Sequence, residues 1–347
     1  MAKQLFWKTA LSILPGFLLA QGVAATPVLA RAELPFIVAQ QANNRQQLNQ
    51  LLRRGRELVD AGDYASAIST YQQAAALDQS NPKIFSGIGF LHARQGNFSE
   101  AVRAYQQALS IEPNNADFYY ALGYSFAQIG DNPNAEIAYQ RAAQLKPESV
   151  NHHLGLGAVL LRQGKYAEAI QVYERAIALE PQYSEIYALM GNALVEQGQY
   201  QDAIAMLESA VQQSPNDASI LEQLAIAQIK GGNPQAGLQT LRQVVRLNPR
   251  NPQVYLEMGR LLREQGHREE AKKAYEEAAL LDPNSLEIQQ AAGEILLEEE
   301  EYLMAIVAFR RATELDPNNA AAHHNLGLAL LGRGRTLDAI EALEKAR

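Results

Sequence analysis

The residues best suited to metal or acid–base chemistry are two histidine pairs and a run of glutamates. His152 precedes His153, and His323 precedes His324. Adjacent residues on a helix point in different directions, so neither pair is arranged to chelate a metal. The four glutamates at 298–301 cross from a predicted helix into a turn, whereas a calcium site needs oxygens that converge from a looped backbone. We therefore expect His153 and His323, at the fourth position of their repeats, to pack and the glutamates to be solvated.

The sequence of 347 residues contains no strong catalytic signature. It has neither a GxxxxGK(S/T) phosphate-binding loop nor an HExxH motif. It has no cysteine, which excludes disulfides, thiolate metal sites and a cysteine nucleophile. The 38 acidic and 30 basic side chains give a net charge of -8, which disfavours a general nucleic-acid binder because phosphates require a basic surface. The lack of these signatures predicts a non-enzymatic protein without a cofactor or metal.

The predicted helices begin after an amino-terminal segment, residues 1–30, that has a different composition from the rest of the chain. Residues 1–30 have the order of a secretory signal peptide: Lys3 and Lys8 precede an apolar stretch at 10–20, and small residues follow. The apolar run is shorter than the ~20 residues that cross a bilayer, so we expect no stable membrane span after cleavage. An uncleaved signal anchor that tethers the protein to a membrane is the alternative. We predict that residues 31–47 form a linker.

The remaining 300 residues, 48–347, repeat in phase every 34 residues, and the last of the nine copies is incomplete. The repeats start at residues 48, 82, 116, 150, 184, 218, 252, 286 and 320. In most copies, position 8 is glycine, positions 20 and 27 are alanine, position 24 is large and position 32 is proline. In the fourth repeat these residues are Gly157, Ala169, Ala176, Tyr173 and Pro181.

This pattern resembles the tetratricopeptide repeat, a pair of helices of this length. The resemblance implies an all-α fold, a right-handed superhelical α-solenoid of stacked antiparallel helix pairs. In the fourth repeat, helical periodicity predicts helices over 152–162 and 166–179. Small side chains at positions 8, 20 and 27 would let the helices approach closely, and the large residue at position 24 would fill the space between neighbouring repeats. In the sixth repeat, Ala225 replaces the usual glycine at position 8 and Gly237 replaces the usual alanine at position 20. This departure reflects either ordinary sequence drift or a softer joint between two rigid halves of the solenoid.

In proteins similar to this one, positions 2, 5, 9, 12 and 13 of the first helix face a concave groove. Carrying these positions over gives six candidate partner-binding residues: Phe90, Tyr120, Tyr124, Leu154, Leu161 and Asn192. Tyr120 and Tyr124 are four residues apart and therefore share one helical face. Whether these side chains bind a partner or only pack is left open by the sequence. Residues 184–347 carry a net charge of -9, so we expect a peptide or helical segment with apolar anchors and some positive charge.

These patterns together predict an exported bacterial scaffold, periplasmic or envelope-associated, that binds other proteins and helps to assemble or tether an envelope complex. The alternative is a self-associating structural protein that polymerises through its incomplete C-terminal end, where Ile340, Leu343 and Ala346 would form an apolar side. Self-association through the incomplete ninth repeat would give a homo-oligomer. The other interpretation of this incomplete repeat is that the chain is a fragment.

Overall fold

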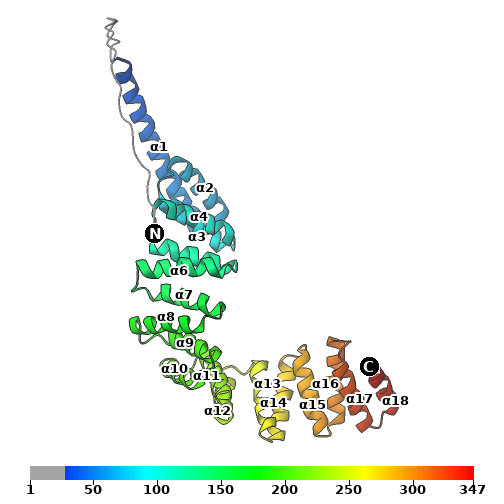
Figure 1. Cartoon of the computed structure of the whole chain (residues 1–347). Coiled ribbons are helices and arrows are strands. Elements are labelled where there is room, and N and C mark those ends of the chain that lie inside the picture. The colour runs from blue at the N-terminus through cyan, green and yellow to red at the C-terminus, as the bar shows by residue number, and fades with distance from the viewer. Residues whose placement is uncertain (1–27) are drawn as a thin grey trace, which may run out of the picture. The chain divides into compact units, whose positions relative to one another are not determined.

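The computed structural model describes the backbone of residues 28–347 and the side chains of residue 40 and residues 42–347. Every regular element in this range is an α-helix, and there are eighteen of them (Figure 1). The signal peptide predicted at residues 1–30 lies outside the described residues except for its last three. The chain divides into two compact parts, Met1–Gln79 and Ser80–Arg347.

The first part holds the helices α1 (Val28–Asp60) and α2 (Tyr64–Leu77), which pack against each other. The predicted linker at 31–47 is wrong, because α1 runs through all of it. The reason is composition: from residue 39 to residue 54 the chain is rich in glutamine, leucine and arginine, which favour helix, and it contains neither glycine nor proline. The first helix of the first repeat is therefore extended towards the N-terminus.

The second part consists of eight helix pairs. Their bounds are α3 (Pro82–Arg94), α4 (Phe98–Ile111), α5 (Ala116–Gln128), α6 (Asn132–Leu145), α7 (Val150–Arg162), α8 (Tyr166–Leu179), α9 (Ser184–Glu196), α10 (Tyr200–Gln213), α11 (Ala218–Lys230), α12 (Pro234–Leu247), α13 (Pro252–Glu264), α14 (Arg268–Leu281), α15 (Leu286–Glu298), α16 (Tyr302–Leu315), α17 (Ala320–Gly332) and α18 (Thr336–Lys345). Consecutive helices lie side by side (Figure 1). The predicted all-α solenoid of stacked helix pairs is confirmed, and each odd-numbered helix from α3 onward begins at a predicted repeat start.

The residue before most of these odd-numbered helices explains where the helix begins. Asn115, for example, accepts a hydrogen bond from the backbone N–H of Phe118 at 3.0 Å, and Asp217 accepts one from Ile220 at 3.2 Å. Such caps satisfy backbone donors that have no partner inside the helix. Asn81, Asn251, Ser285 and Asn319 cap four more of these helices in the same way, whereas the residues before α7 and α9 form no such hydrogen bond. Position 34 of the repeat is thus a helix-starting signal in most copies.

The core of each repeat is built on a contact between positions 8 and 24. A Cβ atom on Gly157 would lie 2.4 Å from Cε1 of Tyr173, so the ring occupies the space that a side chain at position 8 would need. At Tyr173 this contact is with the glycine of its own repeat, whereas our prediction concerned the space between neighbouring repeats. Tyr139 does both, since a Cβ on Gly155 in the next repeat would lie 2.5 Å from its Cε1.

The sixth repeat departs from the pattern for a structural reason. It pairs Ala225 at position 8 with Leu241 at position 24, both of them buried. A Cβ atom on Gly237 would lie 2.5 Å from Cγ1 of Ile229, so glycine at position 20 makes room for a branched side chain. Helices α11 and α12 pack together closely, whereas α12 and α13 have the loosest packing between consecutive helices of residues 80–347. Whether a softer joint exists stays a prediction.

The turn between the two helices of a repeat contains a left-handed residue. Glycines fill this position with φ between 71° and 83° at Gly62, Gly96, Gly130, Gly164, Gly198, Gly232, Gly266 and Gly334. In the eighth repeat the residue is Glu300, with φ 58°, the one non-glycine with positive φ in the described part of the chain. A side chain in this conformation costs roughly 1–2 kcal/mol. The eighth repeat therefore carries a local strain that the other repeats avoid.

Candidate functional site

Three of the six predicted groove residues meet in one pocket of about 300 Å³, which we call the aromatic pocket. Its lining comes from α3, α4 and α5 and consists of Phe90, Ala93, Arg94, Tyr105, Tyr120, Ala121, Tyr124 and Ser125. The surface of this lining is mostly apolar. A volume of this size is at the lower end of the range for ligand sites, and it suits one large side chain of a partner.

The repeat period determines where Phe90 and Tyr124, two exposed aromatic walls of the pocket, lie. Phe90 on α3 and Tyr124 on α5 both stand at position 9, so the packing of consecutive repeats brings them to corresponding places on neighbouring helices. Phe90 is 51% exposed and Tyr124 is 44% exposed. The ring of Tyr124 is held edge-on by Phe98, with centroids 6.0 Å apart and planes at 75°. These two rings are available to a partner without any rearrangement of the core.

Tyr120 forms a half-buried wall of the aromatic pocket and also packs into the core. Its ring lies 5.6 Å from that of Tyr139 in an edge-to-face arrangement and 5.3 Å from that of His152. Burial raises the pKa of the Tyr120 hydroxyl, with a smaller contribution from Tyr124, and lowers the pKa of His152. Both groups are therefore held towards their neutral forms. Tyr120 therefore packs in the core and also lines the aromatic pocket, and whether it binds a partner stays a prediction.

The remaining lining is rigid and carries one charge. Tyr105 is buried, and its burial raises its pKa to about 12. Ser125 is buried too, and its hydroxyl donates to the carbonyl oxygen of Ala121 at 2.8 Å. Arg94, an exposed side chain, is the single ionised group in the lining. The aromatic pocket can therefore bury an apolar group and has a cation beside it.

The other three predicted residues lie elsewhere. Leu154 and Leu161 on α7 are half-buried and pack against the core around Tyr173. Asn192 on α9 is half-buried and does not line the aromatic pocket. Sequence reasoning missed Ala93 and Arg94, although both stand at groove positions, 12 and 13. It had no signal for Tyr105, which reaches the pocket from the second helix of its repeat.

The charged first helices towards the C-terminus are largely paired with each other. Arg260 Nη2 lies 2.5 Å from Oε1 of Glu287 in the next repeat. Arg263 pairs with Glu294 at 3.2 Å and also with Glu298. These cross-repeat ion pairs take up both arginines, so a partner that met this surface would find acids already partly neutralised. Exposed pairs of this kind contribute little stability each.

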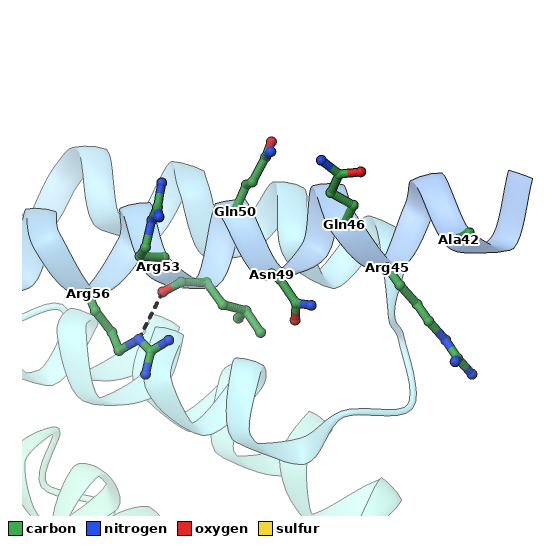
Figure 2. Close-up of a pocket in the computed structure, with 8 residues that line it drawn as sticks. Ala42, Arg45, Gln46, Asn49, Gln50, Arg53 and Arg56 are labelled. Atoms are coloured by element: carbon green, nitrogen blue, oxygen red, sulfur yellow. Dashed lines mark hydrogen bonds between the residues drawn. The ribbon is translucent and has the colours of Figure 1, made fainter. Parts of the chain in front are cut away.

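A polar surface on α1 is a second hollow but has no enclosed centre. It is lined by residues of this one helix, among them Arg45, Gln50, Arg53 and Arg56. Figure 2 shows Gln50 and Arg53 on one side of α1 and Arg45 and Arg56 on the other, so the side chains do not converge. Arg56 Nε donates to the carbonyl oxygen of Leu52 in the same helix at 3.3 Å (Figure 2).

His153 and His323 pack, as predicted. Both are buried, and Nε2 of each donates to a backbone carbonyl: His153 to Pro147 at 2.8 Å and His323 to Pro317 at 2.9 Å. Across the described residues, no three His, Asp or Glu side chains gather as metal ligands would. A search of the same residues for a helix with the length and apolarity of a membrane span finds none.

The comparisons with known proteins agree with this architecture. A family model described as tetratricopeptide repeat matches residues 130–193, 160–229, 194–246 and 228–295, and one described as TPR repeat matches 55–96, 93–130 and 293–334. No curated protein matches the chain.

Solved structures are similar in fold. A tetratricopeptide repeat protein from Parabacteroides merdae is 18% identical, with a TM-score of 0.55, over 72% of this chain and 99% of that one. PilF of Pseudomonas aeruginosa is 22% identical, with a TM-score of 0.51, over 60% of this chain and 94% of its own. MamA of Desulfovibrio magneticus is 24% identical, with a TM-score of 0.47, over 50% and 96%. Together the two family models span residues 55–334, and the chain belongs to the tetratricopeptide repeat family.

Proposed function

We propose that this chain is a non-enzymatic scaffold that holds a peptide or helical segment of a partner protein, with one apolar side chain of that segment in the aromatic pocket. Membership of a repeat family that binds proteins supports the general role. The observation that carries the specific site is the joining of Phe90, Tyr120 and Tyr124 around a pocket of about 300 Å³. Aromatic side chains of this kind are enriched at binding interfaces.

The chemistry of the aromatic pocket defines the anchor. Walls of Phe90, Tyr120 and Tyr124 suit leucine, methionine or phenylalanine, whose burial contributes about 1.5–3 kcal/mol each. One anchor gives weak binding alone, so further contacts along α5 and α7 would be needed for a stable complex. The net charge of -9 over residues 184–347 favours a segment with some positive charge away from the anchor.

The test is a peptide selected from a random displayed library on the full chain and then titrated by calorimetry. Replacing Tyr120 and Tyr124 together by alanine should cost about 2 kcal/mol or more of binding free energy, as for other aromatic hot spots. Phe90→Ala should also weaken binding, because Phe90 is exposed and takes no part in the core.

The matched control is Leu328→Ala, which removes an exposed apolar side chain at the same position 9 of the ninth repeat. We expect this variant to bind as the wild type does. Circular dichroism must show that the double variant keeps its helices, since Tyr120 also packs on Tyr139. Unchanged affinity in a folded double variant would remove the aromatic pocket from the account.

We also propose that the protein is exported and acts in the periplasm or envelope, where it assembles or tethers a complex. The support is the order of basic, apolar and small residues within 1–30. Mass spectrometry of the protein isolated from its source cells should find a new terminus near Arg31 in the exported fraction. An intact start at Met1 in a membrane fraction would support the signal anchor instead, and the same start in a soluble cytoplasmic fraction would contradict export.

A further inference from the structure

The face of α16 formed by Leu303, Met304 and Val307 is apolar, whereas α6 has one large exposed apolar residue at these positions, Ile137, and α8 and α14 have none. Leu303 is 60% exposed, Met304 49% and Val307 57%. The corresponding residues on α14 are Glu269, Glu270 and Lys273, and those on α8 are Ala167, Glu168 and Gln171. Neighbouring exposed apolar side chains of this kind mark interaction surfaces in soluble proteins.

The exposure of this face does not come from a position at the edge of the stack. Helix α16 packs between α15 and α17, and the outer helices of the neighbouring repeats are α14 and α18. Leu337 on α18, at the same repeat position as Leu303, is exposed too and extends the apolar face. The charged outer face of α14 bounds it on the other side.

Side chains of opposite charge, Glu300 and Arg310, lie before and after the apolar residues of α16. On α16, Arg310 lies about one turn after Val307, so Leu303, Val307 and Arg310 share a side of the helix. Glu300 lies in the turn that leads into α16, two residues before its first residue. Both charged side chains are exposed. Among the described residues, neither has a hydrogen-bond or ion-pair partner for its side chain. Along the chain, the apolar face of α16 is thus preceded by an acid in the turn and followed by a base on the helix.

This order is complementary to itself when one copy is reversed. Residues 300 and 310 have the same midpoint, residue 305, as residues 303 and 307. We propose that two copies of the chain pair through antiparallel α16 helices, with a two-fold axis at the level of Ala305. Leu303 then faces Val307 of the second copy, and Glu300 faces Arg310 of the second copy. A parallel pairing would instead place like charges together, which is unfavourable.

The backbone gives an independent argument for a role of Glu300. In the other repeats the left-handed turn position is glycine, which adopts it without strain, and here it is glutamate. Residues kept in strained conformations cluster at functional sites. A glutamate that pairs with a second copy accounts for why this repeat retains a strained residue. The pairing is separate from the aromatic pocket, because α3 and α5 contribute nothing to it.

The experiment is sedimentation of the full chain over a concentration series. The wild type should show a monomer–dimer equilibrium, and Val307→Glu should weaken the dimer at least about tenfold by placing two acids near the axis. The control Gln171→Glu adds the same charge at the same repeat position on α8 and should leave the dimer unchanged. A wild type that stays monomeric throughout, or a dimer that Val307→Glu does not weaken, overturns the proposal.

A charge exchange tests the antiparallel register. Glu300→Arg and Arg310→Glu should each weaken self-association, whereas an equimolar mixture of the two variants should form heterodimers that native mass spectrometry separates by mass. Glu300→Gly should raise the melting temperature and weaken the dimer. Homodimers of the single variants as tight as the wild type, a mixture without heterodimers, or a Glu300→Gly chain with unchanged dimerisation would overturn the register.

Discussion

Replacing Tyr173 with alanine should lower the free energy of unfolding by about 3–5 kcal/mol, the range for deleting a buried aromatic side chain. Tyr173 is fully buried, and its ring lies against the backbone of Gly157. Without the ring, glycine and alanine would face a cavity that neighbouring helices cannot close. Because each repeat is stabilised only by its neighbours, the loss should spread to the adjacent repeats. Urea unfolding followed by circular dichroism measures the difference.

The control for this prediction is Tyr173→Phe. The hydroxyl oxygen of Tyr173 is buried without a hydrogen-bond partner among the described residues, and a buried hydroxyl in that state costs about 1–3 kcal/mol. Phenylalanine keeps the ring and removes this cost, so the variant should be as stable as the wild type or more so. A loss as large as that of Tyr173→Ala would show that the ring is not what holds the repeat together.

The second large effect is expected when a methyl group is added at position 8. In Gly157→Ala the new Cβ would lie 2.4 Å from Cε1 of Tyr173, far inside van der Waals contact. The ring or the helix must move, and overpacking of this kind costs about 1–3 kcal/mol. Thermal and urea unfolding of the variant should both show the loss, although alanine is the better helix former.

The sixth repeat suggests a second substitution that should restore part of the stability lost in Gly157→Ala. It combines Ala225 with Leu241 at positions 8 and 24, so Gly157→Ala together with Tyr173→Leu reproduces a pair that already packs in this protein. The double variant should lose less stability than the two single variants added together, which a double-mutant cycle detects as coupling. Additive losses would mean that positions 8 and 24 do not compete for the same space.

Much of the fold was predictable because the repeat has a fixed length. Helix α8 has the bounds that the sequence predicts, and α7 begins two residues earlier than its apolar pattern, at Val150, directly after the cap position. The linker prediction failed for residues 31–47 because local helix propensity extends α1 beyond the repeat. The contact of Tyr173 with Gly157 could not be predicted because periodicity gives the face of a helix that is buried and does not give the residue that it meets.

The candidate site was predictable in part. Phe90 and Tyr124 share a repeat position, so their neighbourhood follows from the period. The place of Leu154 in the core and of Tyr105 in the pocket lining depends on side-chain directions and on the spacing between helices, which no single repeat encodes. The self-complementary face of α16 becomes visible only when exposure and the left-handed Glu300 are known.

The most direct test of the proposed site is to locate the anchor of a bound peptide. A selected peptide with p-benzoylphenylalanine in place of its apolar anchor is irradiated with the full chain, and the cross-linked residues are mapped by mass spectrometry. The account predicts cross-links to α3 and α5, at residues such as Phe90, Ala93 and Tyr124, which line the aromatic pocket. Cross-links confined to α13–α18, or to the outer helices, would contradict it.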